Sequence, residues 1–147
     1  MSSQTEIRAP RKFVVGLSEA ATSHFAARHA VALAEATGAT VHFVTAVERD
    51  EVSVIPMGSD EFVFDTIESA RVAGERFVES LGTAVPFTVE AVDGPPAKAL
   101  LAAAERIGAD LIVVGNLRMQ GVSRLLGSVG GDVLHSAPCN VLIVKTV

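Results

Sequence analysis

The fold of this chain is decided by the stretch Val113-Val114-Gly115-Asn116-Leu117-Arg118-Met119-Gln120-Gly121-Val122-Ser123-Arg124-Leu125-Leu126-Gly127-Ser128-Val129. Its apolar start predicts a buried strand that carries the backbone to the carboxyl edge of a sheet. Gly127 lets the backbone approach an anion without a Cβ in the way, and Ser128 can cap a helix whose free N–H groups point at that anion. The stretch therefore predicts a strand, a loop able to hold phosphate, and a helix, in that order.

Strand and helix patterns alternate along the rest of the chain. Strands are expected at residues 12–16, 40–47, 86–92, 111–114 and 141–144. A long helix that ends at Gly38 is expected after the first strand, and two further helices are expected at residues 65–81 and 97–107. Elements of this length imply right-handed crossovers and a parallel sheet covered by helices on both faces. We expect one α/β domain over residues 11–147, preceded by a flexible leader at residues 1–10.

The first helix has two adjacent apolar rows at four-residue spacing. One row is Phe25, His29 and Leu33, and the other is Ala26, Ala30 and Ala34. Both rows are expected to face the core, and Ser18, Thr22 or Ser23 is expected to start the helix. Residues 48–62 mix charge, valine, proline and glycine, which indicates a surface loop that could act as a lid.

Composition excludes several classes of function. The 147 residues carry a formal net charge of −5, with one cysteine and neither Trp nor Tyr. Nucleic-acid binding is not expected, because it depends on clustered Lys and Arg. No apolar stretch is long enough to span a bilayer and no signal-peptide core is present, so a cytoplasmic protein without a membrane partner is expected. The four histidines lack metal-ligand spacing, and no Ser-His-Asp or Cys-His order is apparent.

Three predicted strands end at one edge of the sheet. Gly16, Val47 and Gly115 terminate them, and open α/β sheets bind ligands at the carboxyl ends of strands, near the point where the strand order reverses. The loop after Gly115 is neither a P-loop nor a G-x-G-x-x-G fingerprint. It resembles the nucleotide loop of the universal stress protein family, G-x2-G-x9-G-[ST], in the degenerate form G-x2-R-x8-G-S.

The resemblance to that family runs from Phe13-Val14-Val15-Gly16 through the Gly94-Pro95 turn to the end of the chain. It implies a Rossmann-like, adenine nucleotide alpha hydrolase-like fold with a five-stranded parallel sheet. It also implies stress-related regulation, a homodimer formed through the last strand, and binding of ATP. ADP, AMP and cyclic AMP are alternatives, and Mg²⁺ could accompany ATP.

The resemblance also assigns roles to individual residues of the nucleotide site. The residues expected to flank the adenosine are Gly16, Leu17, Ser18, Ala46, Val114 and Gly115. The residues expected near the phosphates are Arg118, Gly127, Ser128 and Val129. The family's first loop usually reads G-x-D-G-S, and here Ser18 replaces the acid, which removes a charged acceptor for the ribose hydroxyls.

Several alternatives stay open at this stage. Arg118 either donates to phosphates or fills their space, and Ser128 is either a phosphate ligand or an ordinary helix cap. A nucleotide-free dimeric interaction module of the same fold is the competing function. An ATPase is less favoured, because the loop at residues 116–126 contains no carboxylate.

The expected dimer depends on the apolar terminal strand from Val141 to Val147. This strand would otherwise leave an exposed sheet edge, and pairing with a second copy covers the edge symmetrically.

Overall fold

Five strands run parallel in one sheet. The computed structural model describes residues 7–48, 59–116, 133 and 135–146. The sheet order is β3-β2-β1-β4-β5, and each neighbouring pair is parallel, which confirms the predicted fold class. The strands are β1 (Lys12–Gly16), β2 (Thr40–Val47), β3 (Phe87–Asp93), β4 (Leu111–Gly115) and β5 (Asn140–Val144).

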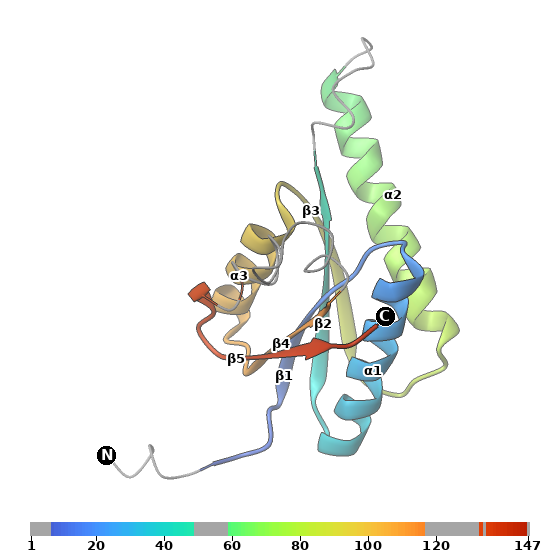
Figure 1. Cartoon of the computed structure of the whole chain (residues 1–147). Helices are drawn as coiled ribbons and strands as arrows, with labels where there is room; N and C mark the ends of the chain where they lie inside the picture. The colour runs from blue at the N-terminus through green and yellow to red at the C-terminus, as the bar shows by residue number, and fades with distance from the viewer. Residues whose placement is uncertain (1–6, 49–58, 117–132, 134, 147) are drawn as a thin grey trace.

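Helices cover both faces of this sheet (Figure 1). Helices α1 (Ala21–Thr37) and α2 (Ser59–Ser80) lie on one face, and α3 (Pro96–Ile107) lies on the other. Two apolar clusters result, one beneath α1 and α2 around Phe13 and Phe43, and one beneath α3 around Ile112 and Leu100. Each cluster buries apolar side chains on one face of the sheet. Burial of apolar surface is the main driving force for folding.

The central strands are buried on both faces, as expected for a parallel sheet. Leu111, Ile112, Val113 and Val114 of β4 are all buried. Their side chains alternate between the two apolar clusters, with Leu111 and Val113 on the α1 side and Ile112 and Val114 on the α3 side. The continuous apolar run in the sequence therefore reflects burial from both sides.

Helix α1 differs from its prediction at its start and on one face. It begins at Ala21 with Ala20 in extended conformation as the N-cap, and no side chain caps it, so none of the three predicted starting residues has that role. The alanine row is buried as predicted, but Phe25 and His29 are exposed, Phe25 by 43%. The small alanines allow the helix to lie close to the sheet, so Phe25 and His29 of the larger row face outward, whereas Leu33 packs partly against the core.

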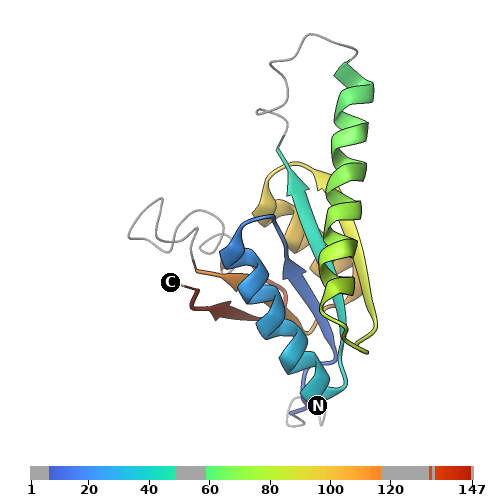
Figure 2. The ribbon, with the colours of Figure 1, turned by 90° about the vertical axis from the view of Figure 1, so that its right-hand side faces the viewer.

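Helix α2 begins earlier than its periodicity suggested. It starts at Ser59, so the predicted surface loop at residues 48–62 is wrong over residues 59–62, and residues 49–58 lie outside the described part of the chain. In both views the first part of α2 projects beyond the carboxyl end of β2 (Figures 1 and 2).

The strand order reverses between β1 and β4. The chain passes from β1 to β2 on one side, whereas β4 and β5 lie on the other. The carboxyl ends of β1, β2 and β4 therefore meet at the predicted switch point. Within the described part of the chain, no helix is both long enough and apolar enough to cross a bilayer.

Candidate functional site

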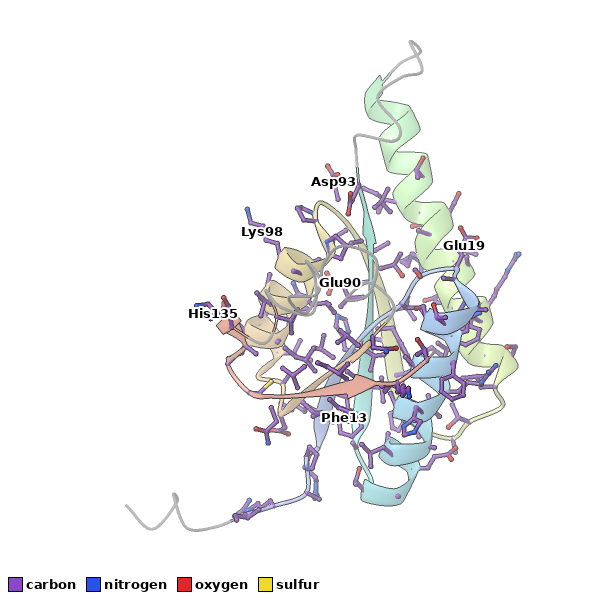
Figure 3. All side chains as sticks on the ribbon, viewed as in Figure 1. Phe13, Glu19, Glu90, Asp93, Lys98 and His135 are labelled. Carbon is purple, nitrogen blue, oxygen red and sulfur yellow. The ribbon has the colours of Figure 1, made fainter. Side chains whose placement is uncertain are left out.

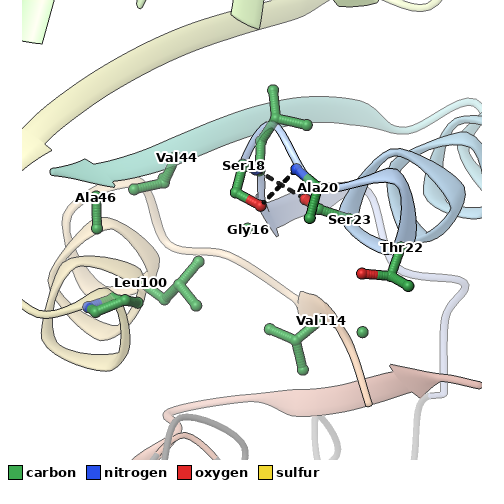
Figure 4. Close-up of a pocket in the computed structure, with 12 residues that line it drawn as sticks. Gly16, Ser18, Ala20, Thr22, Ser23, Val44, Ala46, Leu100 and Val114 are labelled. Carbon is green, nitrogen blue, oxygen red and sulfur yellow. Dashed lines mark hydrogen bonds between the residues drawn. The ribbon is translucent and has the colours of Figure 1, made fainter. Parts of the chain in front are cut away.

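A cleft of about 270 Å³ opens at the switch point (Figure 4). It lies at the carboxyl ends of β1, β2 and β4, between the first turns of α1 and α3. The lining residues are Gly16, Leu17, Ser18, Ala20, Thr22, Ser23, Val44, Ala46, Pro96, Leu100, Val114 and Gly115. None of these described lining residues carries a formal charge.

The walls of the cleft are apolar. Val44 and Ala46 come from β2, Leu100 from α3 and Val114 from β4. A Cβ added at Gly16 would lie 3.5 Å from Leu100 Cδ1 and 3.9 Å from Val114 Cγ1, so the glycine leaves room for about one methyl group. Such a surface suits a flat, weakly polar ring.

The rim of the cleft beside α1 is polar. The Ser18 N–H donates to Ser23 Oγ at 2.8 Å, and the Ala20 N–H donates to Ser18 Oγ at 3.3 Å. Figure 4 shows these two bonds closing the short loop between β1 and α1. Because Ala20 has no side-chain acceptor, no side chain of the described chain caps the first N–H groups of α1. The rim thus offers hydroxyl and amide groups to a polar ligand.

Leu17 fixes the back of the cleft. Its N–H donates to the Val44 carbonyl at 2.9 Å, and its side chain is buried. Helix α2 comes very near at Gly74, where an added Cβ would lie 3.3 Å from Leu17 Cδ2 and 3.0 Å from Val89 Cγ1. The close approach leaves little room for a Cβ at position 74, and it brings α2 against the wall of the cleft.

The exit from β4 is held by Asn116. Its side-chain Oδ1 accepts the Thr146 N–H at 2.8 Å and the Thr146 hydroxyl at 2.9 Å. The Asn116 N–H donates to the Val144 carbonyl at 3.0 Å. These bonds attach the end of β4 to the residues after β5, at the point where the chain enters the glycine-containing stretch.

The structure brings together all of the predicted site residues that it describes. Six of them line the cleft, namely Gly16, Leu17, Ser18, Ala46, Val114 and Gly115. Arg118, Gly127, Ser128 and Val129 lie outside the described residues. The role of the whole set in nucleotide binding stays a prediction.

Other lining residues were missed by sequence reasoning. Val44 lies two positions before Ala46 on the same strand face, so strand alternation could have identified it. Pro96 and Leu100 belong to the first turns of α3, whose start after the Gly94-Pro95 turn could have placed them at the same edge. Thr22 and Ser23 were interpreted only as helix starters, although both line the cleft.

Among residues 7–48, 59–116, 133 and 135–146, no group of three or more His, Cys, Asp or Glu is placed to hold a metal ion. The expectation of Mg²⁺ with ATP stays a prediction.

Comparison with known proteins identifies the family of the chain. Residues 10–145 match the Universal stress protein family. This chain belongs to the universal stress protein family. Universal stress protein MJ0531 of Methanocaldococcus jannaschii is 31% identical over 139 residues, covering 92% of this chain and 82% of that protein.

Solved structures of universal stress proteins share the fold. A universal stress protein crystallised in complex with cAMP is 29% identical with a TM-score of 0.72, covering 95% of this chain and 99% of that one. Protein Rv1636 of Mycobacterium tuberculosis H37Rv is 30% identical with a TM-score of 0.54, covering 97% of this chain and 100% of that one. These likenesses confirm the predicted Rossmann-like α/β fold.

Proposed function

We propose that this universal stress protein is a regulatory domain that binds an adenine nucleotide in the cleft at the carboxyl ends of β1, β2 and β4. The proposal is carried by one observation: six residues assigned to the site from sequence line a single cleft with apolar walls and a polar rim. The family member solved with cAMP supports an adenine nucleotide as the class of ligand.

The cleft suggests how the parts of the ligand are divided. The adenine ring would lie against Val44, Ala46, Leu100 and Val114, and the ribose would lie by Ser18. Arg118, Gly127, Ser128 and Val129 would bind the phosphates, with Mg²⁺ accompanying ATP. The Ser18 hydroxyl is a neutral acceptor for the ribose, which gives weaker hydrogen bonds than a carboxylate would. ATP and cAMP are therefore the two ligands to compare first.

Regulation is proposed here in preference to hydrolysis. None of the described residues lining the cleft is a carboxylate or a histidine, so this part of the wall supplies no general base to activate a water molecule. Any ATP hydrolysis would be slow and incidental. The domain is taken to extend over residues 11–147 and to work in the cytoplasm.

The proposed assembly is a homodimer formed through the segment from Val141 to Val147. Strand β5 is at the edge of the sheet, and its Val141, Leu142 and Ile143 are only partly buried. Pairing with a second copy would satisfy the outer edge and cover these side chains. Sedimentation of the purified chain tests this, because a monomer at micromolar concentration would contradict it.

The experiment for the site is nucleotide extraction followed by calorimetric titration with ATP and with cAMP. We expect bound nucleotide, or a dissociation constant near micromolar, which corresponds to roughly −8 kcal/mol. Ala46→Leu places a larger side chain in the cleft and should weaken binding at least about tenfold, or about 1.4 kcal/mol. Ala32→Leu, at an exposed position of α1, is the matched control and should bind normally.

The second candidate is the nucleotide-free interaction module, favoured by the uncharged lining of the described cleft. It predicts no extracted nucleotide and no heat of titration. If Ser18 and Arg118, which stand where the family has an acid and a glycine, closed the site, Ser18→Asp or Arg118→Gly would create measurable ATP affinity.

A further inference from the structure

A chain of four polar side chains crosses the opposite end of the sheet. The hydroxyl of Thr88 on β3 is hydrogen-bonded to His42 Nδ1 on β2, its register partner. His42 Nε2 lies 2.5 Å from Glu90 Oε1 on β3, and Arg106 Nη2 on α3 is paired with the same carboxylate oxygen. Figure 3 labels Glu90 on the side of the sheet that α3 covers.

The hydrogen-bond directions follow from the chemistry of the groups. Arg106 only donates, and the Glu90 carboxylate only accepts, so His42 Nε2 carries the hydrogen that points at Glu90. Nδ1 of a neutral His42 is then the acceptor, and the Thr88 hydroxyl donates to it. The order is hydroxyl, imidazole and carboxylate, which is the arrangement by which a base activates a nucleophile.

Thr88 is an exposed residue that lines a cavity. Thr88 is exposed, whereas the His42 and Glu90 side chains retain only 14% and 25% of their exposure. Thr88 and His42 line a shallow cleft of about 330 Å³ together with Lys12, Pro86 and Ile107. The cleft combines an apolar wall with a cation, and its lining residues come from the amino ends of the strands, far from the nucleotide cleft.

The amide of the residue after Thr88 faces the outer edge of the sheet. The ladder between β2 and β3 begins with the Val41 N–H on the Pro86 carbonyl and ends with the Gly94 N–H on the Val47 carbonyl. Alternate amides of β3 therefore bond to β2, and the N–H of Val89 points to the other edge, where the described chain has no further strand.

We propose that Thr88 is a nucleophile that accepts a short acyl group from an activated ester or thioester, with His42 as its general base. Thr88 Oγ1 bonds to the carbonyl carbon while its proton passes to His42 Nδ1. The bond to the leaving group then breaks, and the leaving oxygen or sulfur takes that proton. Water cleaves the resulting ester by the same route, which releases the carboxylic acid and restores Thr88. Glu90 and Arg106 are positioning residues.

The test uses the full chain with p-nitrophenyl acetate. Nitrophenolate release is followed by absorbance, and peptide mapping locates any acetyl group. We expect acetyl transfer to Thr88, and a loss of about 10²-fold or more in rate for Thr88→Val and for His42→Gln, the usual scale of general base catalysis. Thr40→Val, which removes another hydroxyl from the same cleft, should react like the parent chain.

The positioning role has its own readout. Glu90→Gln should lose most of the rate, and Glu90→Asp should recover part of it, with unfolding midpoints measured to show that each variant is folded. Turnover or a stable acetyl group on Thr88 supports the proposal. The proposal is overturned if the Thr88→Val chain reacts as fast as the parent or if acetylation is confined to Lys12. The four side chains would then only hold α3 against β3. Neither result depends on nucleotide binding.

Discussion

Replacing Asn116 by alanine should destabilise the whole domain. The side-chain oxygen of Asn116 accepts two hydrogen bonds from Thr146, at 2.8 and 2.9 Å, in a partly buried setting. Each bond contributes about 1 kcal/mol net, so losing both costs about 2 kcal/mol. For a domain of this size each kcal/mol lowers the melting temperature by about 2 to 4 °C, which predicts a fall of about 4 to 8 °C.

Two further variants separate the contributions of the two hydrogen bonds to the free energy of unfolding. Asn116→Asp retains an oxygen that accepts both bonds, so its stability should stay within about 0.5 kcal/mol of the parent. Thr146→Val removes only the hydroxyl donor and should cost about 1 kcal/mol. Urea unfolding followed by circular dichroism gives all three values. The reasoning is refuted if Asn116→Ala is as stable as the parent, or if Asn116→Asp is as unstable as Asn116→Ala.

The remaining predictions concern a thiol, an ion pair and a close contact. Burial raises the pKa of the Cys139 thiol and the charge of Asp110 raises it further, so iodoacetamide should react slowly at neutral pH. Asp110→Asn should accelerate that alkylation, and an unchanged rate would show that Asp110 does not raise the pKa of the Cys139 thiol. The hydrogen bond from Arg71 lowers the pKa of Glu68, so its contribution is present above the unfolded pKa and is lost as pH falls through the folded pKa. Arg71→Gln should return that pKa to its usual range in an NMR titration. Gly74→Ala should lose stability overall, because overpacking of about 1 to 3 kcal/mol outweighs a helix-propensity gain of about 1 kcal/mol. A more stable variant in urea unfolding would contradict the contact.

Local patterns in the sequence were sufficient for most elements. The run of four apolar residues at the start of β4 predicted a strand buried on both faces, and Gly38 and Gly108 marked the ends of α1 and α3. Both glycines have the left-handed conformation that ends helices, with φ of 76° and 69°. These features depend on neighbours within a few residues, and they could therefore be predicted.

The errors arose where local patterns are degenerate. Two adjacent rows of α1 together form a largely apolar stripe in the sequence, and only packing against the sheet turned Phe25 and His29 outward. The first turn of α2 was assigned to a loop because Pro56 and Gly58 precede it. A helix boundary is determined by cooperative extension from a packed interior as well as by its own residues.

The candidate cleft was likewise predictable in part from local sequence patterns and in part only from tertiary packing. The glycines and hydroxyl residues at the ends of β1 and β4 indicated which edge of the sheet would carry it, and the resemblance selected six of its lining residues. The contribution of α3 through Leu100 required the helix to be placed over β1 and β2. The periodicity of the sequence does not predict that placement, because it depends on which face of the sheet each helix packs against.

By itself the sequence determined the alternation of strands and helices, the parallel sheet, and the edge of the sheet at which the candidate cleft opens. Only the tertiary structure decided the strand order, the outward face of α1, and the meeting of His42, Thr88, Glu90 and Arg106. The physical reason is range: hydrophobic period and turn chemistry act over a few residues, whereas strand register and helix docking join side chains separated by dozens of residues.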